Sequence, residues 1–427
     1  MNVKRFLNKT NFQPDAEELL RIKEETKEFC DLLREQIMND KIDADVFVGG
    51  SFAKGTLTRE DNYDVDVFVR FDWEYEDLSP ILKVIVEKVA KKMSIKLDSV
   101  HGSRDYYRIS KRAGLVFEIV PVTRIKKTTE ARNVTDLSYF HVNYILKNLP
   151  KNLRGEVAIA KRFCKAQRVY GAESYINGFS GYGLECLIVY YRSFEKMLRE
   201  LSKLKERKII DLKKFYKNKN EIFVEMSESK MSGPIVLVDP TKKDRNTLAA
   251  LNYETFGKFQ EVARAFLKSP SEKFFHSSMK SKEDFIKNEK KKRRKVLTVV
   301  IGTDRQEGDI AGTKMKKFSG FLVKEMSKYF TIFEKDFSYN GGQSSEVLIS
   351  LLSKKEIVRV GPPIDNLKAV KSFKRKNRNT FVKGKIIYSR KKVDFDAKEF
   401  VEMFKQEYGK KIAEMSIVEI IVKDINN

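Results

Sequence analysis

The segment of residues 46–71 constrains the fold most, because it predicts two strands joined by a glycine turn. β-forming residues at 46–48 lead into Gly49-Gly50-Ser51, and a second strand is expected over 65–71. Consecutive glycines leave backbone N–H groups open, and the Ser51 hydroxyl adds another donor. The turn therefore has the donors to cradle an anion.

Two acids lie where the second strand begins. Because strand side chains alternate between faces, Asp64 and Asp66 are expected on one face, about 7 Å apart, with Val65, Val67 and Val69 on the other. Like charges so placed repel unless a cation lies between them, and Mg²⁺ prefers carboxylate oxygens. An exposed strand edge with scattered acids is the alternative interpretation.

A third acid, Glu118, lies in the segment 115–122, and all the remaining residues of this segment are apolar or proline. An all-apolar strand is typically buried on both faces. Burying an unpaired carboxylate there destabilises the fold by on the order of several kcal/mol. Glu118 is therefore expected to have a partner, and a metal shared with Asp64 and Asp66 is the simplest hypothesis. Three carboxylates on adjacent strands can hold two Mg²⁺ ions for in-line displacement at a phosphate.

This pattern resembles a known family. Gly-Gly-Ser followed about a dozen residues later by Asp-x-Asp, with a third acid on a later strand, is similar to the nucleotidyltransferase superfamily of polymerase β. Four later segments resemble the archaeal, class I CCA-adding enzymes, which add the 3′ CCA end of tRNA. These segments are 170–191, 234–251, 269–275 and 361–377.

The resemblance implies an α+β fold with a polymerase β-like nucleotidyltransferase head, a mostly helical neck and body, and an α/β tail. We assign these parts to residues 1–135, 136–280 and 281–427. It also implies Mg²⁺ as cofactor and CTP and ATP as donors. The 3′-hydroxyl of tRNA would attack the α-phosphorus, and pyrophosphate would leave.

The resemblance also assigns roles to individual residues. Asp64, Asp66 and Glu118 match the catalytic, metal-binding acids, although the family more often has Asp at the third position. The expected nucleotide-binding residues are Gly50, Ser51, Lys54, His141, Lys161, Tyr170 and Arg245. Arg245 matches the arginine that faces the base, and Asp239 or a backbone carbonyl is a candidate acceptor for the base's amino group.

Several of these residues lie on predicted helices. Lys161, Lys165 and Arg168 share one face of a helix predicted over 156–168, where a solvated face is the alternative. Arg245 is expected at or near the start of a helix over 245–268. The segment 184–191 predicts a buried helix, so its one acid, Glu185, requires a partner that the sequence does not identify.

Local patterns predict further elements along the chain. Amphipathic periodicity favours helices over 14–39 and 78–92, and a hairpin is expected over 106–122. Helix 142–149, strand 234–238, strand 296–302, helix 314–329 and strand 345–352 follow in that order. The run 287–295 holds seven basic residues and one acid, and is expected to be a linker, a solvated helix face or a nucleic-acid contact.

The charge of the chain indicates a polyanionic partner. The formal net charge is +25 and the sequence pI is about 9.6. Residues 368–392 hold eleven Lys and Arg and no acid, interleaved with aromatic residues, a composition suited to RNA. The residues expected to contact tRNA are Lys371, Lys374, Arg375 and Lys376.

Other features limit location and partners. Three widely spaced cysteines, Cys30, Cys164 and Cys186, suggest neither a zinc motif nor a disulfide framework, which fits the cytoplasm. The N-terminus lacks a signal-peptide pattern and no apolar stretch is long enough for a membrane span. The sequence is also compatible with a homodimer. The rival hypotheses are another template-independent RNA polymerase, such as a poly(A) or oligoadenylate synthase, and a non-catalytic RNA-binding protein.

Overall fold

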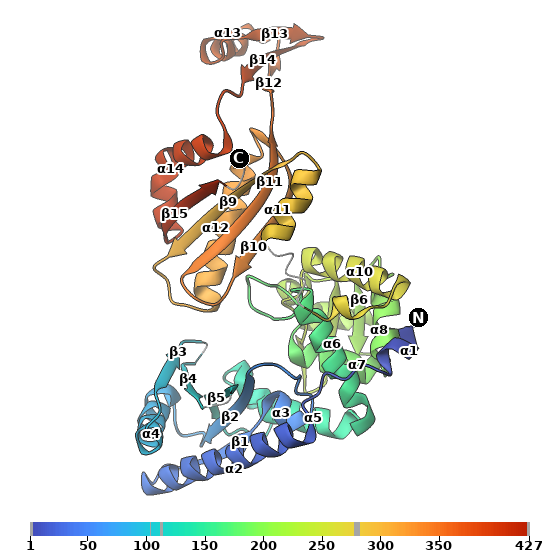
Figure 1. The fold of residues 1–427 in the computed structure, drawn as a ribbon, viewed down its shortest axis with the longest axis vertical. Helices are drawn as coiled ribbons and strands as arrows, with labels where there is room; N and C mark the ends of the chain where they lie inside the picture. Colours follow the sequence, from blue (N-terminus) through green and yellow to red (C-terminus); the bar gives the residue numbers. More distant parts are fainter. Residues whose placement is uncertain (1–2, 103, 112–113, 277–281, 425–427) are drawn as a thin grey trace. The chain divides into compact units, whose positions relative to one another are not determined.

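The structure is a computed structural model that describes residues 3–102, 104–111, 114–276 and 282–424. The chain divides into two units (Figure 1). The first unit comprises residues 1–172 and 176–278, and the second comprises residues 173–175 and 279–427.

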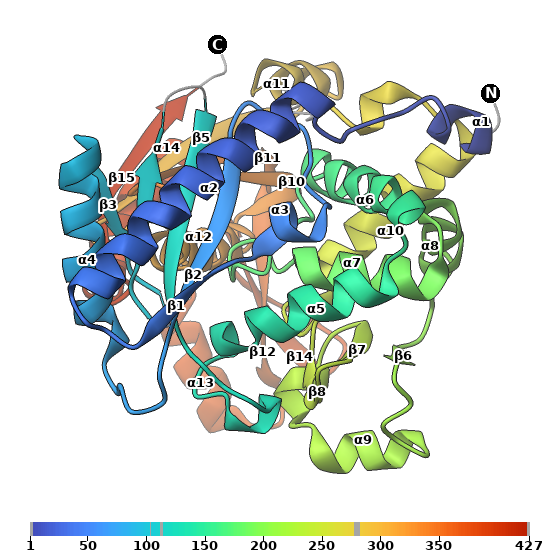
Figure 2. The ribbon, with the colours of Figure 1, turned by 90° about the horizontal axis from the view of Figure 1, so that it is seen from below.

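A five-stranded sheet in the first unit carries the segment 46–71. Its strands are β1 (Ala44–Val48), β2 (Tyr63–Phe71), β3 (Leu97–Val100), β4 (Tyr106–Ser110) and β5 (Leu115–Thr123), in the order β1-β2-β5-β4-β3. The β2–β5 pair is parallel and the other pairs are antiparallel. The short helix α3 (Gly50–Lys54) follows β1. Helix α2 (Ala16–Asn39) runs across the sheet, as Figure 2 shows, and α4 (Leu78–Met93) packs beside it.

Local sequence signals explain these elements. Asp15 and Glu18 form a capping box that starts α2, and the two helices predicted over 14–39 and 78–92 are confirmed. The hairpin predicted over 106–122 is confirmed by the antiparallel β4–β5 pair, although residues 112–113 of its turn lie outside the described residues. Val65, Val67 and Val69 are fully buried, as the alternation predicts.

The burial of β5 differs from the prediction. Its residues alternate, so that Phe117 and Ile119 are buried in the core shared with α2 and α4, whereas Val116, Glu118 and Val120 are only partly buried. The expectation of burial on both faces is wrong because these two helices pack against one face of the strand. A run of apolar letters does not by itself reveal which face is covered.

The rest of the first unit has a second, mostly helical core. Its helices are α1 (Val3–Leu7), α5 (Ser138–Asn148), α6 (Arg154–Ala166), α7 (Gly181–Tyr191), α8 (Phe194–Leu201) and α10 (Tyr253–Lys268). A small sheet in the order β6-β7-β8 adds β6 (Lys208–Asp211), β7 (Ile235–Asp239) and β8 (Lys242–Asn246), and α9 (Lys219–Glu225) precedes β7. The phenylalanine of α1, Phe6, contacts Phe266 and Phe275 in this core.

One predicted helix boundary here is wrong. Arg245 lies on β8 and not at the start of a helix, because β7 and β8 form a hairpin whose turn is fixed by Asp239 and Thr241. The helix begins only at Tyr253, after Asn252 caps its first turn. The strand predicted over 234–238 is confirmed as β7.

The second unit contains two sheets. The larger, in the order β10-β11-β9-β15, comprises β9 (Lys295–Thr303), β10 (Phe330–Tyr339), β11 (Ser344–Ser353) and β15 (Ile417–Asp424). Its helices are α11 (Lys282–Lys291), α12 (Asp309–Met326) and α14 (Ala397–Glu414). The smaller sheet, in the order β12-β14-β13, comprises β12 (Glu356–Pro363), β13 (Thr380–Lys383) and β14 (Ile386–Lys392), with α13 (Leu367–Lys376). In the described part of the chain, no helix is long and apolar enough to cross a membrane.

Candidate active site

The three predicted acids meet on one face of the head sheet. In the parallel β2–β5 pair, Asp66 lies directly beside Glu118, and Asp64 lies two residues earlier on the same face of β2. Asp64 is exposed, whereas Asp66 and Glu118 are partly buried. Strand alternation and parallel register thus place three carboxylates next to one another.

The electrostatics of Asp66 reflect this crowding. Burial, and next the negative charge of Glu118, raise the pKa of Asp66 from its ordinary value of 3.8 to about 6, while the nearby Lys54 opposes the rise. Burial and the neighbouring negative charge both disfavour the ionised form of Asp66, and a bound cation would stabilise it. The group therefore fits a site that a cation completes.

Glu118 has a partner that the sequence did not predict. Arg108 on β4 lies across from it in the antiparallel pair, and its Nε and Nη2 atoms are 2.7 Å and 2.5 Å from Glu118 Oε1. The inference that a buried Glu118 needs a metal as its partner is corrected, because a guanidinium already neutralises this partly exposed carboxylate. Among the described residues, no group of three His, Cys, Asp or Glu side chains stands in a metal-holding arrangement.

The glycine turn lies against Asp66. Gly50 has a φ of +61°, and a Cβ atom placed on it would lie 1.6 Å from Asp66 Oδ2, so no larger residue fits. The Gly49 N–H donates to the Asp66 backbone carbonyl at 2.9 Å. Gly50 and Ser51, the first residues of α3, therefore adjoin the carboxylates of β2.

Two of the expected nucleotide-binding lysines meet at a buried acid. Glu185 on α7 is fully buried and accepts hydrogen bonds from Lys54 Nζ at 2.6 Å and from Lys161 Nζ at 2.9 Å. The Thr56 hydroxyl donates to the same carboxylate at 2.6 Å. These three groups are the partner that Glu185 requires. The lysines come from α3 and α6, so the contact joins the two cores of the first unit.

The face formed by Lys161, Lys165 and Arg168 is not uniformly solvated. Lys161 is buried, Lys165 is half-buried and pairs with Glu60, and Arg168 is exposed beyond the end of α6 at Ala166. The predicted helix was therefore two residues too long at its C-terminal end. The solvated-face alternative is wrong for Lys161.

Tyr170 lies close to the same lysines. Its ring centroid is 5.1 Å from Lys165 Nζ. A Cβ atom on Gly181 would lie 2.7 Å from Tyr170 Oη and 3.9 Å from Lys161 Cε, so a glycine at 181 leaves the room that both side chains occupy. Tyr170, Lys161 and Lys54 therefore belong to one cluster.

A second buried acid, Asp239, organises the other two expected nucleotide-binding residues. Its Oδ2 atom is 3.0 Å from His141 Nε2 and 2.6 Å from Arg245 Nη1, and its Oδ1 accepts from Thr241. Burial by itself would raise the pKa of Asp239, but the hydrogen bond and charge of His141 and the charge of Arg245 hold it well below its usual range. Tyr182 stacks on His141 with the ring centroids 4.0 Å apart.

This arrangement changes the expectation for Asp239. Its carboxylate is fully buried and already accepts hydrogen bonds from protein groups, so it orients Arg245 instead of standing open to a base. Sequence reasoning missed Tyr182 and this orienting role, although the aspartate two residues before Thr241 was a signal for a tight turn.

A cavity of about 490 Å³ lies beside Arg245 in the first unit. Its volume is in the range of small-molecule sites. The residues on its wall that carry positive charge are Arg132, Lys230, Lys242 and Arg245.

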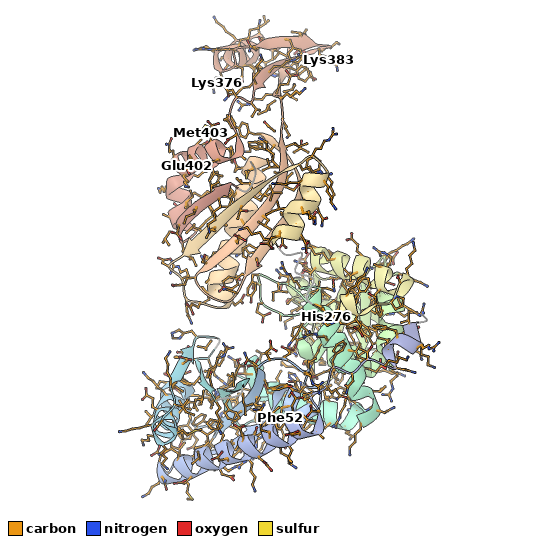
Figure 3. All side chains as sticks on the ribbon, in the orientation of Figure 1. Phe52, His276, Lys376, Lys383, Glu402 and Met403 are labelled. Atoms are coloured by element: carbon orange, nitrogen blue, oxygen red, sulfur yellow. The ribbon has the colours of Figure 1, made fainter. Side chains whose placement is uncertain are left out.

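The expected RNA-binding residues lie in the second unit. Lys371, Lys374, Arg375 and Lys376 are exposed on α13, which has no buried residue. Figure 3 shows Lys376 at the end of this helix and Lys383 on the adjoining small sheet. The Phe381 and Tyr388 rings of that sheet stack on each other with centroids 5.5 Å apart.

Comparison with known proteins places this site in a family. Residues 23–134 match the nucleotidyltransferase domain family, and residues 155–276 match the family described as tRNA nucleotidyltransferase, second domain. The CCA-adding enzyme of Nanoarchaeum equitans is 32% identical over 338 residues, which cover 77% of this chain and 81% of that protein. The CCA-adding enzyme of Methanosarcina mazei is 31% identical, over 78% of this chain and 72% of that protein.

A solved structure agrees with the fold. A mutant of the Cid1 poly(U) polymerase bound to MgATP superposes with a TM-score of 0.50 and 14% identity, over 65% of this chain and 98% of that chain. At this identity the likeness shows the nucleotidyltransferase fold alone. The identity to the archaeal proteins over most of both chains shows more, and the chain belongs to the family of CCA-adding enzymes, which are tRNA nucleotidyltransferases.

Proposed function

We propose that the protein adds C, C and A to the 3′ end of tRNA without a template, using CTP and ATP and releasing pyrophosphate. The observation that carries the proposal is the meeting of Asp64, Asp66 and Glu118 on one sheet face, against the Gly50 turn. Membership of the family supplies the identity of the substrates.

We propose Mg²⁺ as the cofactor, held by Asp64, Asp66 and Glu118. The donor set fits, because all three groups offer carboxylate oxygens, and a bound cation would offset the burial and the Glu118 charge that raise the pKa of Asp66. When bound, the cation lowers the pKa of the attacking 3′-hydroxyl and offsets charge on the phosphate. Glu118 must share or release Arg108 in order to ligate it.

The protein's own groups hold the donor nucleotide in this proposal. The backbone at Gly50 and the Ser51 hydroxyl bind the β- and γ-phosphates, and Lys54, Lys161 and Tyr170 add positive charge and a hydroxyl. His141 lies near the phosphates and, through Asp239, is linked to Arg245. In this proposal, hydrogen bonds through Asp239 therefore join one phosphate-side group, His141, to the base-facing Arg245.

Arg245 selects the base. Cytosine and adenine each present a ring-nitrogen acceptor beside an amino donor, whereas uracil and guanine present a ring N–H donor beside a carbonyl. A guanidinium offers only donors, so it bonds the ring nitrogen of C or A and meets a donor in U or G. Asp239 holds one side of Arg245 and thereby limits the directions in which the remaining N–H groups point.

The second unit binds the tRNA body in this proposal. The exposed Lys371, Lys374, Arg375 and Lys376 contact RNA phosphates. We divide the chain into a catalytic head at 1–135, a neck and body that reads the base at 136–280, and a basic tail at 281–427. Cytoplasmic location rests on the three free, buried cysteines, and a homodimer stays a prediction without an observation to carry it.

The experiment is incubation of the protein with Mg²⁺ and each labelled nucleotide on tRNA that ends before CCA. We expect two C residues and then one A, with no incorporation of U or G. A long run of A would identify a poly(A)-type polymerase instead, and no incorporation on any RNA would identify a non-catalytic RNA-binding protein.

A further inference from the structure

Glu185 is a buried carboxylate that is shared by two lysines and a threonine hydroxyl. It is fully buried on α7 and accepts three hydrogen bonds, from Lys54, Lys161 and Thr56. Lys161 Nζ also lies 3.2 Å from the Thr56 backbone carbonyl and 3.1 Å from its hydroxyl oxygen. Two ammonium groups therefore share one carboxylate, and the cluster has a surplus of positive charge.

The cluster connects the phosphate-binding turn to the helical body. Lys54 is the last residue of α3, the helix that begins with Gly50, and Thr56 follows it in the chain. Lys161 and Glu185 come from α6 and α7. Glu185 thus fixes the position of α3 relative to two helices of the second core.

Without Glu185, the two lysines would not remain where they are. Both are nearly fully buried, and every hydrogen bond found for Lys54 Nζ in the described residues goes to Glu185. Two buried ammonium groups without a carboxylate repel each other, and an uncompensated buried charge is strongly destabilising. At least one of them must move toward solvent or lose its proton.

The charged surroundings do not replace Glu185. In the described part of the chain, the titratable groups that also interact with the two lysines include Lys165 on α6, Asp66 on β2 and His141 on α5. The ring centroid of Tyr182 on α7 lies 5.8 Å from Lys54 Nζ. Lys165 adds to the repulsion and itself pairs with Glu60. Asp66 belongs to the carboxylates of the catalytic face.

We propose that Glu185 is a positioning residue for the triphosphate: it holds Lys54 and Lys161 side by side, with net positive charge, where the β- and γ-phosphates bind. This inference rests on the proposed function, which assigns phosphate binding to these two lysines. Glu185 itself does not touch the nucleotide. It acts through the lysines, and it contributes to affinity for the phosphate chain and not for the base or the tRNA.

The test is the binding of inorganic tripolyphosphate, which has the phosphate chain but no base, measured by competition against labelled CTP in the presence of Mg²⁺. The main variant is Glu185→Gln. Because it removes a buried charge and can impair folding, Thr56→Val serves as a milder second variant that keeps all charges and removes only the hydroxyl.

The second unit offers a matched control. Glu289 is also buried and accepts from two cations and a hydroxyl, with Lys292 at 2.6 Å, Arg294 at 3.1 Å and Ser350 at 2.6 Å. Glu289→Gln therefore removes a buried carboxylate with the same kinds of partners. Its effect on tripolyphosphate binding measures the general cost of such a change.

We expect Glu185→Gln to weaken tripolyphosphate binding by about tenfold or more, and Thr56→Val to weaken it by about threefold. In both variants the KM for CTP should rise with little change in kcat at saturating CTP, and tRNA affinity should stay near the wild-type value. The Glu289→Gln control should bind tripolyphosphate about as tightly as the wild type. If Glu185→Gln does not fold, the result for Thr56→Val decides.

The inference is overturned if a folded Glu185→Gln variant binds tripolyphosphate as tightly as the wild type. Where Glu185→Gln does not fold, wild-type binding by Thr56→Val overturns it. It is also overturned if Glu289→Gln weakens tripolyphosphate binding as much as Glu185→Gln does. Lys161→Met separates this failure from failure of the proposed function. If Lys161→Met also binds tripolyphosphate normally, then the assignment of the phosphates to these lysines is wrong. If it binds weakly while the Glu185 variant does not, only the positioning role is wrong.

Discussion

Replacing Asp66 by asparagine is expected to stabilise the metal-free protein at alkaline pH while it removes a carboxylate that we propose binds Mg²⁺. The pKa of Asp66 is raised from 3.8 to about 6, first by burial and then by the charge of Glu118. The folded protein therefore binds a proton at this group more tightly than the unfolded chain does. Stability from protonated Asp66 is complete below about pH 4 and is lost as the pH rises through about 6.

The magnitude follows from the two pKa values. A tenfold change in proton affinity is worth about 1.4 kcal/mol, so ionised Asp66 costs the folded state about 3 kcal/mol at pH 8. Near pH 4.5 the same difference contributes only about 1 kcal/mol, because Asp66 is then mostly protonated in the folded protein. The gain in the free energy of unfolding from Asp66→Asn should therefore grow by about 2 kcal/mol between these pH values.

The assay is differential scanning calorimetry in EDTA at both pH values. A gain of about 3 kcal/mol corresponds to several degrees in the melting temperature of the transition that contains the head. Asp61→Asn is the control, since Asp61 is exposed just before β2, and its effect should stay within about 0.5 kcal/mol at either pH. Addition of Mg²⁺ should stabilise the wild type more than Asp66→Asn. If Asp66→Asn is less stable than the wild type at pH 8, or if the difference does not change with pH, then ionised Asp66 does not destabilise the folded state.

Three further predictions concern the other residues of the account. Glu118→Asp should keep a substantial part of the activity because a carboxylate remains, whereas Glu118→Gln should lose most of it. Arg108→Met, which frees the carboxylate, should lower the Mg²⁺ concentration needed for half-maximal activity. An unchanged Mg²⁺ requirement would show that Arg108 does not compete with Mg²⁺ for Glu118. Arg245→Ala should weaken the use of CTP and ATP and reduce their preference over UTP and GTP in steady-state kinetics on tRNA lacking CCA; discrimination at the wild-type level would assign base selection elsewhere. tRNA affinity should fall steeply with salt, and the logarithmic slope should become less steep by about 0.7 to 0.9 for each phosphate contact removed when three of the α13 cations are neutralised. An unchanged slope would contradict the assignment of RNA binding to these cations, which are Lys371, Lys374, Arg375 and Lys376.

The placement of Asp64 and Asp66 on one strand face was predictable from local sequence because strand geometry is local. The period of two puts Asp64 and Asp66 together whatever the rest of the chain does, and the structure shows them so. The position of Glu118 beside Asp66 depends on the parallel register of two strands about 50 residues apart in the chain, which periodicity does not predict. Adjacent strands were expected only because Glu118 was thought to need a metal as its partner.

The partners of buried charges were not predictable. Glu185 was recognised as an acid that needs a partner, yet Lys54 lies 131 residues away in sequence and Lys161 lies 24 away. Arg108 was passed over because nothing in its local pattern indicates which residue lies across the hairpin. Pairing of charges depends on tertiary packing, and a single sequence records the need for a partner but not its identity.

Errors at element boundaries have a similar cause. Arg245 was expected on a helix because a long helical pattern follows it, but the side chain of Asp239 makes a tight turn that keeps residues 242–246 extended. The misjudged burial of β5 arose because the positions of the covering helices are set by the whole domain. Local turn chemistry and tertiary contacts overrode periodicity at both places.

We propose that Asp64 and Asp66 together carry the addition of CCA. The most direct test is a single-turnover measurement of labelled CTP and ATP incorporation on tRNA lacking CCA, with tRNA binding measured in parallel, for the wild type, Asp64→Asn and Asp66→Asn. We expect two C and one A for the wild type, incorporation rates below about one tenth of the wild-type rate in both variants, and nearly unchanged tRNA affinity. Incorporation above one tenth of the wild-type rate in both folded variants would contradict the proposal.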